Sequence, residues 1–146
     1  TRSLDLFDEL LAEPDDQLKL ISKRTNYMVN SWFHNVASLK RSHQQDNPLY
    51  MNPIDARARN LGEGSAVLIS NRWGEITSTI ELDVGLKPGT AAMTHGWGHE
   101  GSLMKVAGQY PGTNINLLLP SGPDSFEPLS NQSFMTGVPI KVEAAP

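Results

Sequence analysis

The chain has 146 residues, the length of one ordinary domain, and 38% of them are hydrophobic. Its 16 acidic and 12 basic residues leave a net charge of −4, which argues against a nucleic-acid backbone as the main ligand. The absence of cysteine excludes disulfides, thiolate metal sites and iron–sulfur ligation by this segment.

The ends of the chain give a first expectation about its context. It begins at Thr1 without a methionine and ends on "EAAP", so we interpret it as a piece of a longer protein. No apolar run is long enough to span a membrane, and we recognise no signal peptide. We therefore expect no membrane contact by this segment and, by default, a cytoplasmic location.

The pattern divides the chain into a helical lead-in, residues 1–16, and one domain, residues 17–146. The strongest local signal is for a helix, because Asn52 is an N-cap type, Pro53 suits the first turn and Gly62 suits the C-terminal cap. Before this helix of about two turns, we expect a helix over 3–13, a strand over 17–24 and a loop with a short helical turn over 25–36. After it, we expect two hairpin strands over 65–83, a short strand over 90–93 and one or two helical turns over 102–108. The chain then continues with a short apolar segment over 114–119, a Pro/Ser/Gly loop over 120–133 and a strand over 138–144. Short strands separated by turns predict a small barrel or sandwich.

The stretch "MTHGWGHEG" contains G-x-G-x-x-G at Gly96, Gly98 and Gly101, which is the fingerprint of nicotinamide and flavin enzymes. A Rossmann unit needs a helix of several turns directly after this motif. The segment that follows breaks at Gly108, and the segment before it predicts a hairpin rather than a βα unit. The pattern therefore disfavours a nicotinamide site.

Three other interpretations of the same stretch stay open. His95 and His99, with Glu100, are possible zinc ligands, but two histidines four apart share a face only in a helix, which the glycines disfavour. A plain turn would use the glycines for left-handed backbone and pack Trp97 in the core. A backbone cradle would instead let the main chain approach a ligand, with Trp97 and the histidines supplying stacking and hydrogen bonds.

The stretch "NSWFHN", Asn30–Asn35, is unusually rich in polar and aromatic groups. One interpretation is a loop that caps itself with Asn and Ser hydrogen bonds, with Trp32 and Phe33 in the core. The alternative is a polar ligand that lies over the loop, with Arg24 at the strand end available to pair with a phosphate.

Two further amides stand in "GTNIN". Asn114 and Asn116 would share one strand face if this segment were extended. Buried amides are costly unless they are paired, and a heteroaromatic ligand rich in N–H and C=O groups would pair them.

Taken in order, Arg24 with "NSWFHN", then "THGWGHEG", then "GTNIN" resemble the C-terminal dinucleotide-binding domain of molybdopterin oxidoreductases. This group includes formate dehydrogenases, nitrate reductases and dimethyl sulfoxide reductases. The stretches "MNPIDARARNLGEGSAVLISNRWGEI", "GLKPGTAAMTHGWGH" and "GVPIKVE" are also similar, so the resemblance covers about residues 17–143. One departure is "SFMTGVP", where family members commonly have a Lys or Gln that reaches the cofactor.

The resemblance implies a mainly β fold, a double-psi β-barrel with two or three short peripheral helices. It implies a cofactor-binding domain that closes over a molybdopterin guanine dinucleotide, whose Mo or W is bound through other domains. The implied partners are these remaining domains of a parent oxidoreductase, and the segment itself has no catalytic or metal-ligating residue. The implied cofactor-binding residues are Arg24, Asn26, Asn30, Ser31, Asn35, His95, Gly96, Trp97, Gly98, His99, Asn114 and Asn116.

Two other functions compete with this one. A non-catalytic double-psi barrel for interaction or assembly would turn the tryptophans and asparagines toward a protein partner. A stand-alone zinc hydrolase would use His95, His99 and Glu100.

Overall fold

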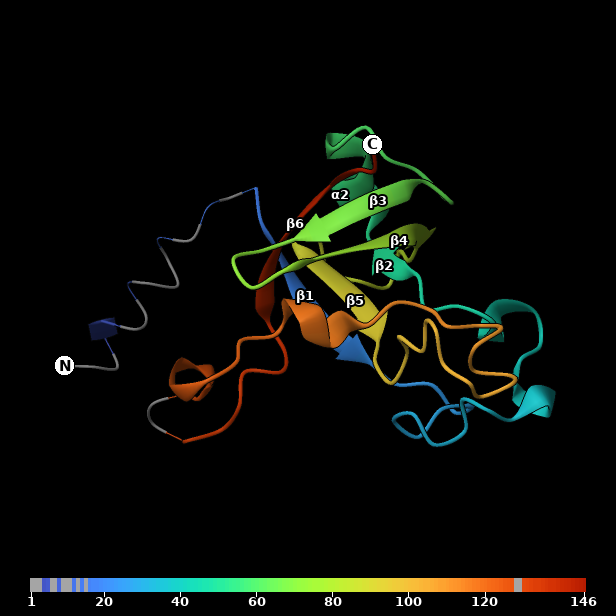
Figure 1. The fold of residues 1–146 in the computed structure, drawn as a ribbon. Helices are drawn as coiled ribbons and strands as arrows, with labels where there is room; N and C mark the ends of the chain where they lie inside the picture. The colour runs from blue at the N-terminus through green and yellow to red at the C-terminus, as the bar shows by residue number, and fades with distance from the viewer. Residues whose placement is uncertain (1–3, 6–7, 9–11, 13, 15, 128–129) are drawn as a thin grey trace.

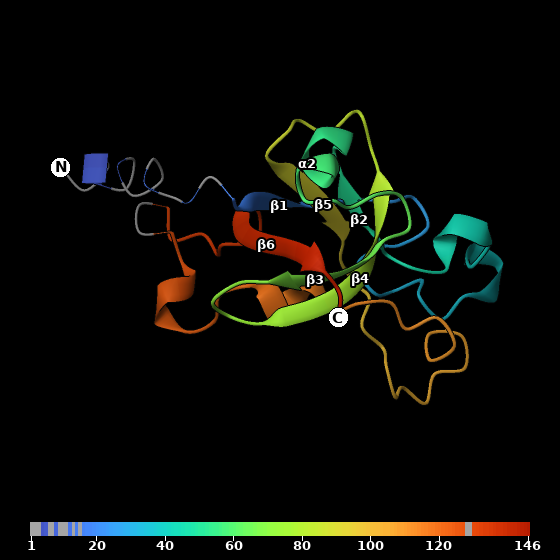
Figure 2. The ribbon, with the colours of Figure 1, turned by 90° about the horizontal axis from the view of Figure 1, so that it is seen from above.

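Six strands form a closed barrel in the computed structural model, which describes residues 4–5, 8, 12, 14, 16–127 and 130–146. The strands are β1 (Leu18–Lys23), β2 (Leu49–Met51), β3 (Ala66–Ser70), β4 (Glu75–Leu82), β5 (Thr90–Thr94) and β6 (Val138–Ala144). Their order around the barrel is β1-β5-β2-β4-β3-β6 (Figures 1 and 2). The pairs β1–β5 and β2–β4 are parallel, and the other four are antiparallel. The expected double-psi β-barrel is confirmed, whereas the helix expected over 3–13 lies largely outside the described residues.

The helices are short and lie outside the barrel (Figure 1). They are the α-helix α2 (Pro53–Ala58) and the 3-10 turns η1 (Ala37–Leu39), η2 (Ser42–Gln44), η3 (Ile115–Leu118) and η4 (Pro123–Ser125). Among the described residues, none of these helices has the length and apolar character that crossing a bilayer requires.

The core follows from the two-residue period of the strands. Alternate side chains of a strand point to opposite faces, so one set fills the barrel and the other faces outward. Leu18 and Leu20 of β1 are buried, as are Val67 and Ile69 of β3, while their neighbours are partly or fully exposed. The inward set also includes Ile76, Ile80, Val138, Ile140 and Val142.

The helix α2 begins as the sequence predicts and ends earlier. The Asn52 side-chain oxygen accepts from the Ile54 N–H at 2.8 Å, and Pro53 opens the first turn. The helix ends at Ala58, where Asn60 takes a left-handed backbone with φ of 57°. The expected cap at Gly62 is therefore wrong, because an asparagine tolerates the left-handed region and closes the helix two residues sooner.

The hairpin of β3 and β4 is confirmed, with its turn over residues 71–74. The Asn71 N–H donates to the Gly74 carbonyl at 3.0 Å, and the Asn71 side-chain oxygen accepts from the Trp73 N–H at 2.9 Å. Two other segments contain short turns. Within residues 102–108, where one or two helical turns were expected, the Gly108 N–H donates to the Met104 carbonyl at 2.8 Å and closes a single turn. The apolar segment after Asn114 is the 3-10 helix η3.

The parallel pairing of β1 with β5 positions the loops that matter below. Lys23 lies opposite Thr94, so both strands end at the same edge of the barrel. The segments that follow, residues 24–47 and 95–114, lie side by side beyond that edge in both views (Figures 1 and 2). Residues far apart in the sequence therefore meet at one end of the molecule.

Truncating the core should destabilise the barrel. We expect Ile69→Ala to lower the free energy of unfolding by about 2–5 kcal/mol, because it removes buried methyl groups and leaves a cavity. Urea denaturation measures the change. The matched control, Val84→Ala, removes an exposed side chain and should stay within about 0.5 kcal/mol of the wild type. Equal losses in the two variants would contradict the burial of Ile69.

Candidate functional site

A chain of side-chain hydrogen bonds joins the two segments at the carboxyl ends of β1 and β5. The Asn30 side-chain oxygen accepts from an Arg24 guanidinium nitrogen at 2.9 Å and contacts His95 Nε2 at 2.8 Å. On the far side of the ring, His95 Nδ1 lies 3.0 Å from the Ser22 hydroxyl. Asn30 itself takes a left-handed backbone with φ of 50°. Three of the predicted site residues, Arg24, Asn30 and His95, are therefore in contact.

The hydrogen bonds define the protonation state of His95. An amide oxygen only accepts, so His95 Nε2 donates to Asn30 and Nδ1 accepts from the Ser22 hydroxyl. Burial lowers the pKa of His95, and the nearby Arg24 guanidinium lowers it further. At neutral pH the imidazole is thus uncharged, and Arg24 supplies a permanent positive charge. Among the described residues, no carboxylate forms an ion pair with Arg24.

A second positive charge at this end is already paired. Lys23 Nζ lies 3.3 Å from a carboxylate oxygen of Asp83 and 3.4 Å from the centre of the Tyr50 ring. The Gly85 N–H and Lys23 together hold the pKa of Asp83 below its usual value. Burial raises the pKa of Tyr50 to about 12, so its hydroxyl stays protonated. Of these two cations, Arg24 is the one available to an anionic ligand.

The glycines of residues 96–98 let the main chain pack directly against its neighbours. Gly96 and Gly98 have φ of 90° and 99°, in the left-handed region. A Cβ at Gly96 would overlap the Asn30 carbonyl and lie 2.9 Å from the Ser31 nitrogen. A Cβ at Gly98 would overlap Asn114, whereas one at Gly101 would meet nothing within 4 Å. Close approach explains two of the three glycines in the motif.

Residues 96–99 form the glycine loop, which is hydrogen-bonded to the segment of residues 111–114. The Pro111 carbonyl accepts from Gly98 N–H at 2.8 Å and from His99 N–H at 3.2 Å. Asn47 is fully buried, and its amide donates to the Thr94 and Thr113 carbonyls at 2.9 Å each. Its side-chain oxygen accepts from Thr113 N–H at 2.7 Å. A single buried amide thus holds the end of β5 next to this segment.

A cluster of rings and cations lies beneath the loop. Trp97 is buried, and the Lys40 ammonium lies 4.2 Å from its ring centre. The buried ring of His34 packs edge-on against Trp97 and His99, at centroid distances of 4.5 and 4.4 Å. Burial lowers the pKa of Lys40, whose ammonium also contacts the Met28 sulfur at 3.5 Å. Among the described residues, no carboxylate pairs with Lys40.

Several buried polar atoms at this end have no hydrogen-bond partner in the described part of the protein. They are the Thr25 and Thr94 hydroxyls, Trp97 Nε1 and His99 Nδ1. Thr94 lines a small pocket together with Arg24, Met28, Asn30 and His95, among others. A buried polar group without a partner costs about 1–3 kcal/mol, so native proteins retain few of them. Unpaired donors and acceptors beside Arg24 and a close-packed glycine loop form a donor set that fits a polar, anionic cofactor.

Other predicted residues have different positions. Asn35 lies in the same loop, but its side-chain oxygen accepts from Val106 and Ala107 N–H groups at 2.8 and 3.1 Å, which fixes the 102–110 segment. Asn26 is exposed in the turn after β1. These two residues are not joined to the Arg24–Asn30–His95 group by the contacts described above.

The expected Asn114–Asn116 strand face is wrong. Asn114 is the N-cap of η3, and its side-chain oxygen accepts from the Asn116 N–H at 3.1 Å. A capping asparagine favours helical over extended backbone, so alternate residues no longer share a face. Asn114 meets the glycine loop at Gly98, whereas the exposed Asn116 belongs to the first turn of η3.

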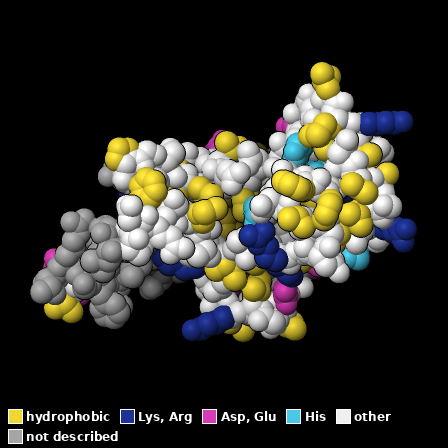
Figure 3. All heavy atoms as spheres, turned by 90° about the horizontal axis from the view of Figure 1, so that it is seen from below, with side chains coloured by type: hydrophobic (Ala, Val, Ile, Leu, Met, Phe, Trp, Pro, Cys, Tyr) yellow, Lys and Arg dark blue, Asp and Glu magenta, His cyan; other side chains and the backbone are white. Residues whose placement is uncertain are grey.

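The expectation that Trp32 and Phe33 fill the core is also wrong. Trp32 is 80% exposed and Phe33 is 41% exposed, because the turns over residues 26–35 point these rings away from the barrel. Seen from below, hydrophobic side chains gather over this half of the molecule, with His and Lys or Arg side chains between them (Figure 3). The exposed apolar residues of the two neighbouring loops are Val29, Trp32, Phe33, Val36, Leu103 and Met104.

The zinc alternative gains no support from the described residues. Among them, no group of three His, Cys, Asp or Glu side chains is placed to hold a metal ion. His95 is hydrogen-bonded through both ring nitrogens, and His99 packs against His34. The glycines keep this segment out of a helix, which removes the shared face that the spacing would require.

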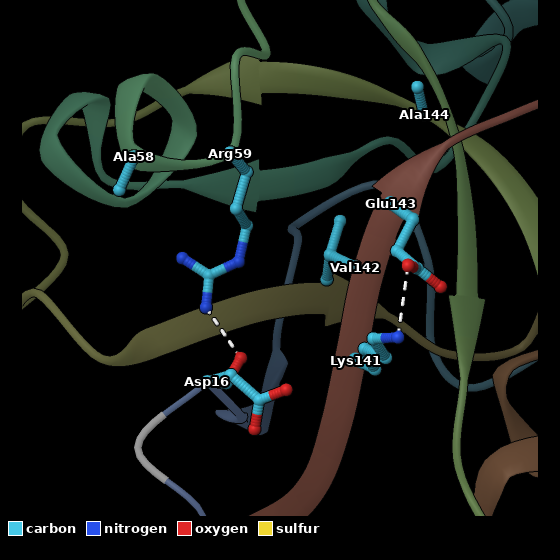
Figure 4. A pocket seen from close by; sticks show the side chains of 7 residues that line it. All are labelled: Asp16, Ala58, Arg59, Lys141, Val142, Glu143 and Ala144. Carbon is cyan, nitrogen blue, oxygen red and sulfur yellow. Dashed lines mark hydrogen bonds and ion pairs between the residues drawn. The ribbon is translucent and has the colours of Figure 1, made fainter.

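A larger pocket in the described part of the chain lies elsewhere, near the start of β1 (Figure 4). It measures about 480 Å³ and is lined by Asp16, by Arg59 after α2 and by the second half of β6. Three of its charged side chains already have partners, since Arg59 donates to the Asp16 carbonyl at 2.7 Å and Lys141 pairs with Glu143 at 2.9 Å. Size alone therefore does not identify the site.

From the sequence, no role was assigned to Ser22, Lys40 or Asn47. His34 was considered only as part of the stretch Asn30–Asn35. Lys40 and Asn47 stand in a polar stretch, "LKRSHQQDN", whose composition is typical of a solvated loop. Asn47 directly before Pro48 and a strand is a weak turn signal, and nothing in the letters indicates that its side chain is fully buried.

Comparisons with known proteins bear on the family and the fold of this chain. The family described as "Molydopterin dinucleotide binding domain" matches residues 18–137. The tetrathionate reductase of Salmonella typhimurium has a subunit that is 36% identical over 84 residues, which are 56% of this chain and 8% of that protein. Dimethyl sulfoxide reductase DmsA of Haemophilus influenzae is 34% identical over 68 residues, which are 47% of this chain and 8% of that protein. Acetylene hydratase from Pelobacter acetylenicus shares the fold, with a TM-score of 0.71 and 19% identity over 97% of this chain and 20% of that one.

The glycine contacts predict a difference between matched variants. Gly98→Ala and Gly101→Ala both place a Cβ on left-handed backbone, which costs about 1–2 kcal/mol. Only Gly98→Ala also overlaps Asn114, so we expect it to lower the free energy of unfolding further. Urea denaturation of both variants measures the difference. Equal losses would show that Gly98 is needed for its backbone conformation alone.

Burial of His34 predicts a dependence of stability on pH. Burial lowers the pKa of His34 below its usual value of about 6.5, so the folded protein prefers the neutral ring. The stabilisation is complete above the unfolded pKa and is lost as the pH falls through the folded pKa. Between about pH 7.5 and 5.5, the wild type should therefore lose more unfolding free energy than His34→Gln. An equal loss in both proteins would contradict the burial effect.

Proposed function

This chain belongs to the molybdopterin dinucleotide-binding domain family, and we propose that it holds the cofactor at the end of the barrel formed by residues 24–47 and 95–114. Binding of a molybdopterin dinucleotide is the function of the family. The chain spans less than a tenth of the length of the two curated relatives, so the whole protein contains further domains. We propose that this parent protein is a molybdenum or tungsten oxidoreductase.

The proposed position of the cofactor rests on one observation. Arg24, Asn30 and His95 are hydrogen-bonded together beside a pocket where the buried Thr94 hydroxyl has no partner among the described residues. A guanidinium that no described carboxylate neutralises matches phosphate oxygens, and amide and imidazole groups match the N–H and C=O edges of a pterin or guanine. Gly96 and Gly98 also let the main chain of the loop approach other groups closely, as it does at Asn30 and Asn114.

The residues of this chain would act by binding and orientation. When bound, the cofactor supplies the metal and the electron-transfer chemistry. Arg24 would neutralise phosphate charge, and Asn30, His95 and the Thr94 hydroxyl would fix orientation through hydrogen bonds. Gly96 to Gly98 would supply backbone contact. The roles of Asn26, Ser31, Asn35, His99, Asn114 and Asn116 in direct contact stay predictions, as does the cytoplasmic location.

The apolar surface beside the site supports contact with the remaining domains. Exposed apolar patches larger than scattered single residues mark interaction surfaces. Val29, Trp32 and Phe33 stand next to Asn30 in sequence, and Leu103 and Met104 follow the glycine loop. We propose that the other domains of the parent cover this patch and enclose the cofactor. This arrangement also accounts for the features that favoured a pure interaction module.

The full-length parent protein provides the direct test. We expect it to purify with molybdenum or tungsten and to release a guanine nucleotide after acid treatment. A folded full-length protein with neither component would overturn the proposal.

Arg24 gives a sharper test on the same protein. Arg24→Ala removes a charge-assisted hydrogen bond worth about 1.5–3 kcal/mol, so we expect about 10- to 100-fold weaker retention of the cofactor. Arg24→Lys keeps the charge without the fork geometry and should be intermediate. The control is Arg72→Ala, since Arg72 stacks on Trp73 in the β3–β4 turn. Retention is measured as guanine nucleotide per protein after dialysis, and equal retention in Arg24→Ala and Arg72→Ala would remove Arg24 from the site.

A further inference from the structure

The ring of His34 contacts two separate parts of the segment 95–114. Its side chain is almost fully buried. Its Nε2 lies 2.7 Å from the Tyr110 carbonyl, and its Nδ1 lies 3.3 Å from the Gly96 carbonyl. These carbonyls belong to two segments that are held together further on, where Gly98 and His99 donate to Pro111. One imidazole therefore spans the base of the glycine loop.

The chemistry of these contacts assigns the proton. Both partners are acceptors, and a neutral imidazole has a single N–H. The shorter contact places that N–H on Nε2, which donates to the Tyr110 carbonyl. Burial lowers the pKa of His34 and outweighs the Tyr110 and Gly96 carbonyls, which favour the charged ring, while the nearby Lys40 and His99 lower the pKa further. The neutral ring with the proton on Nε2 is the state at neutral pH.

Packing holds the same ring from its sides. Its edge contacts with Trp97 and His99 place it against the two large side chains of the glycine loop. The Lys40 ammonium lies over the Trp97 ring, 4.2 Å from its centre. Gly112, with φ of 58°, lies so close that a Cβ there would overlap the Trp97 ring. The loop is therefore fixed by contacts within this chain, before any ligand is counted.

We infer that His34 is a positioning residue that sets the backbone of Gly96–Gly98 in its cofactor-binding shape before the cofactor binds. The inference rests on the proposed function for the identity of the ligand, but the loop geometry is a property of this chain. Because its ring is almost fully buried, His34 has no surface to offer a ligand directly. It acts through its hydrogen bond to the Tyr110 carbonyl and its packing against Trp97 and His99, and a preordered loop reduces the ordering cost of binding.

The substitutions His34→Gln and His34→Asn distinguish the contact with the Tyr110 carbonyl from the contact with the Gly96 carbonyl. The side-chain nitrogen of glutamine occupies about the place of His Nε2, and that of asparagine occupies about the place of Nδ1. His34→Gln therefore keeps the donor to the Tyr110 carbonyl, whereas His34→Asn and His34→Leu lose it. His43 offers a matched control, because it is an exposed histidine on η2 whose ring packs edge-on against Tyr27 at 6.2 Å.

The experiment is hydrogen exchange in the full-length parent, expressed in a host that cannot make the cofactor. Exchange is followed at the Gly98 and His99 amides, whose N–H groups are bonded to the Pro111 carbonyl. We expect slow exchange in the wild type, about 10-fold or faster exchange in His34→Leu and His34→Asn, and near wild-type exchange in His34→Gln. Residues 66–82 of the β3–β4 hairpin report on the barrel, and His43→Leu should leave both regions unchanged.

Each outcome decides the inference. Fast exchange of the wild-type apoprotein would show that the loop is ordered only by the cofactor, which overturns it. Wild-type exchange in His34→Leu, or equal exchange in His34→Gln and His34→Asn, would overturn it as well. If His34→Leu also exposes residues 66–82, the comparison of the Gln and Asn variants still decides. Because no cofactor is present, these results do not depend on whether the parent binds a molybdopterin dinucleotide.

Discussion

The parallel pairing of β1 with β5 is the constraint on which the site depends. Its register sets Lys23 opposite Thr94, so the residues that follow, Arg24 and His95, leave the barrel at the same edge. An antiparallel pair would have sent these two segments to opposite ends of the molecule. The hydrogen bonds of Asn30 with both side chains are possible only because backbone pairing has already brought the strand ends together.

Local parts of the fold were predictable because their causes are local. The start of α2 follows from Asn52 and Pro53, and the turn of the β3–β4 hairpin follows from Asn71 and Gly74. The order of strands around the barrel is different, since it joins β1 to β5 and β3 to β6 across long stretches of chain. Short strands alone left a barrel and a sandwich equally open. The ordered set of motifs, through family resemblance, selected the double-psi barrel.

Some candidate site residues could be proposed from the sequence because their residue types suggest ligand contact. Arg24, Asn30 and the glycine loop were proposed as a cation, an amide and closely spaced glycines, and the structure brings them together. Lys40 and Asn47 were missed because a buried polar side chain and a solvated one look alike in a sequence. Their roles depend on burial, which is set by the packing of Trp97 and by the end of β5. Asn114 was placed on the wrong backbone because its capping role competes with strand formation.

The two ends of the barrel show what separates a site from a cavity. Near the start of β1, three charged side chains of the larger pocket, Arg59, Lys141 and Glu143, already pair with one another or with the backbone. Beyond the end of β5, the smaller pocket has a Thr94 hydroxyl without a hydrogen-bond partner and an Arg24 guanidinium that no described carboxylate neutralises. In the loop that follows β5, the buried Trp97 and His99 nitrogens also lack partners among the described residues. Beyond the end of β5, buried polar groups without partners lower the stability of the fold, while contacts within the chain hold the backbone in place. Natural proteins tolerate such costs mainly where a ligand repays them, so polar groups left unpaired on a rigid backbone are the stronger indication of function.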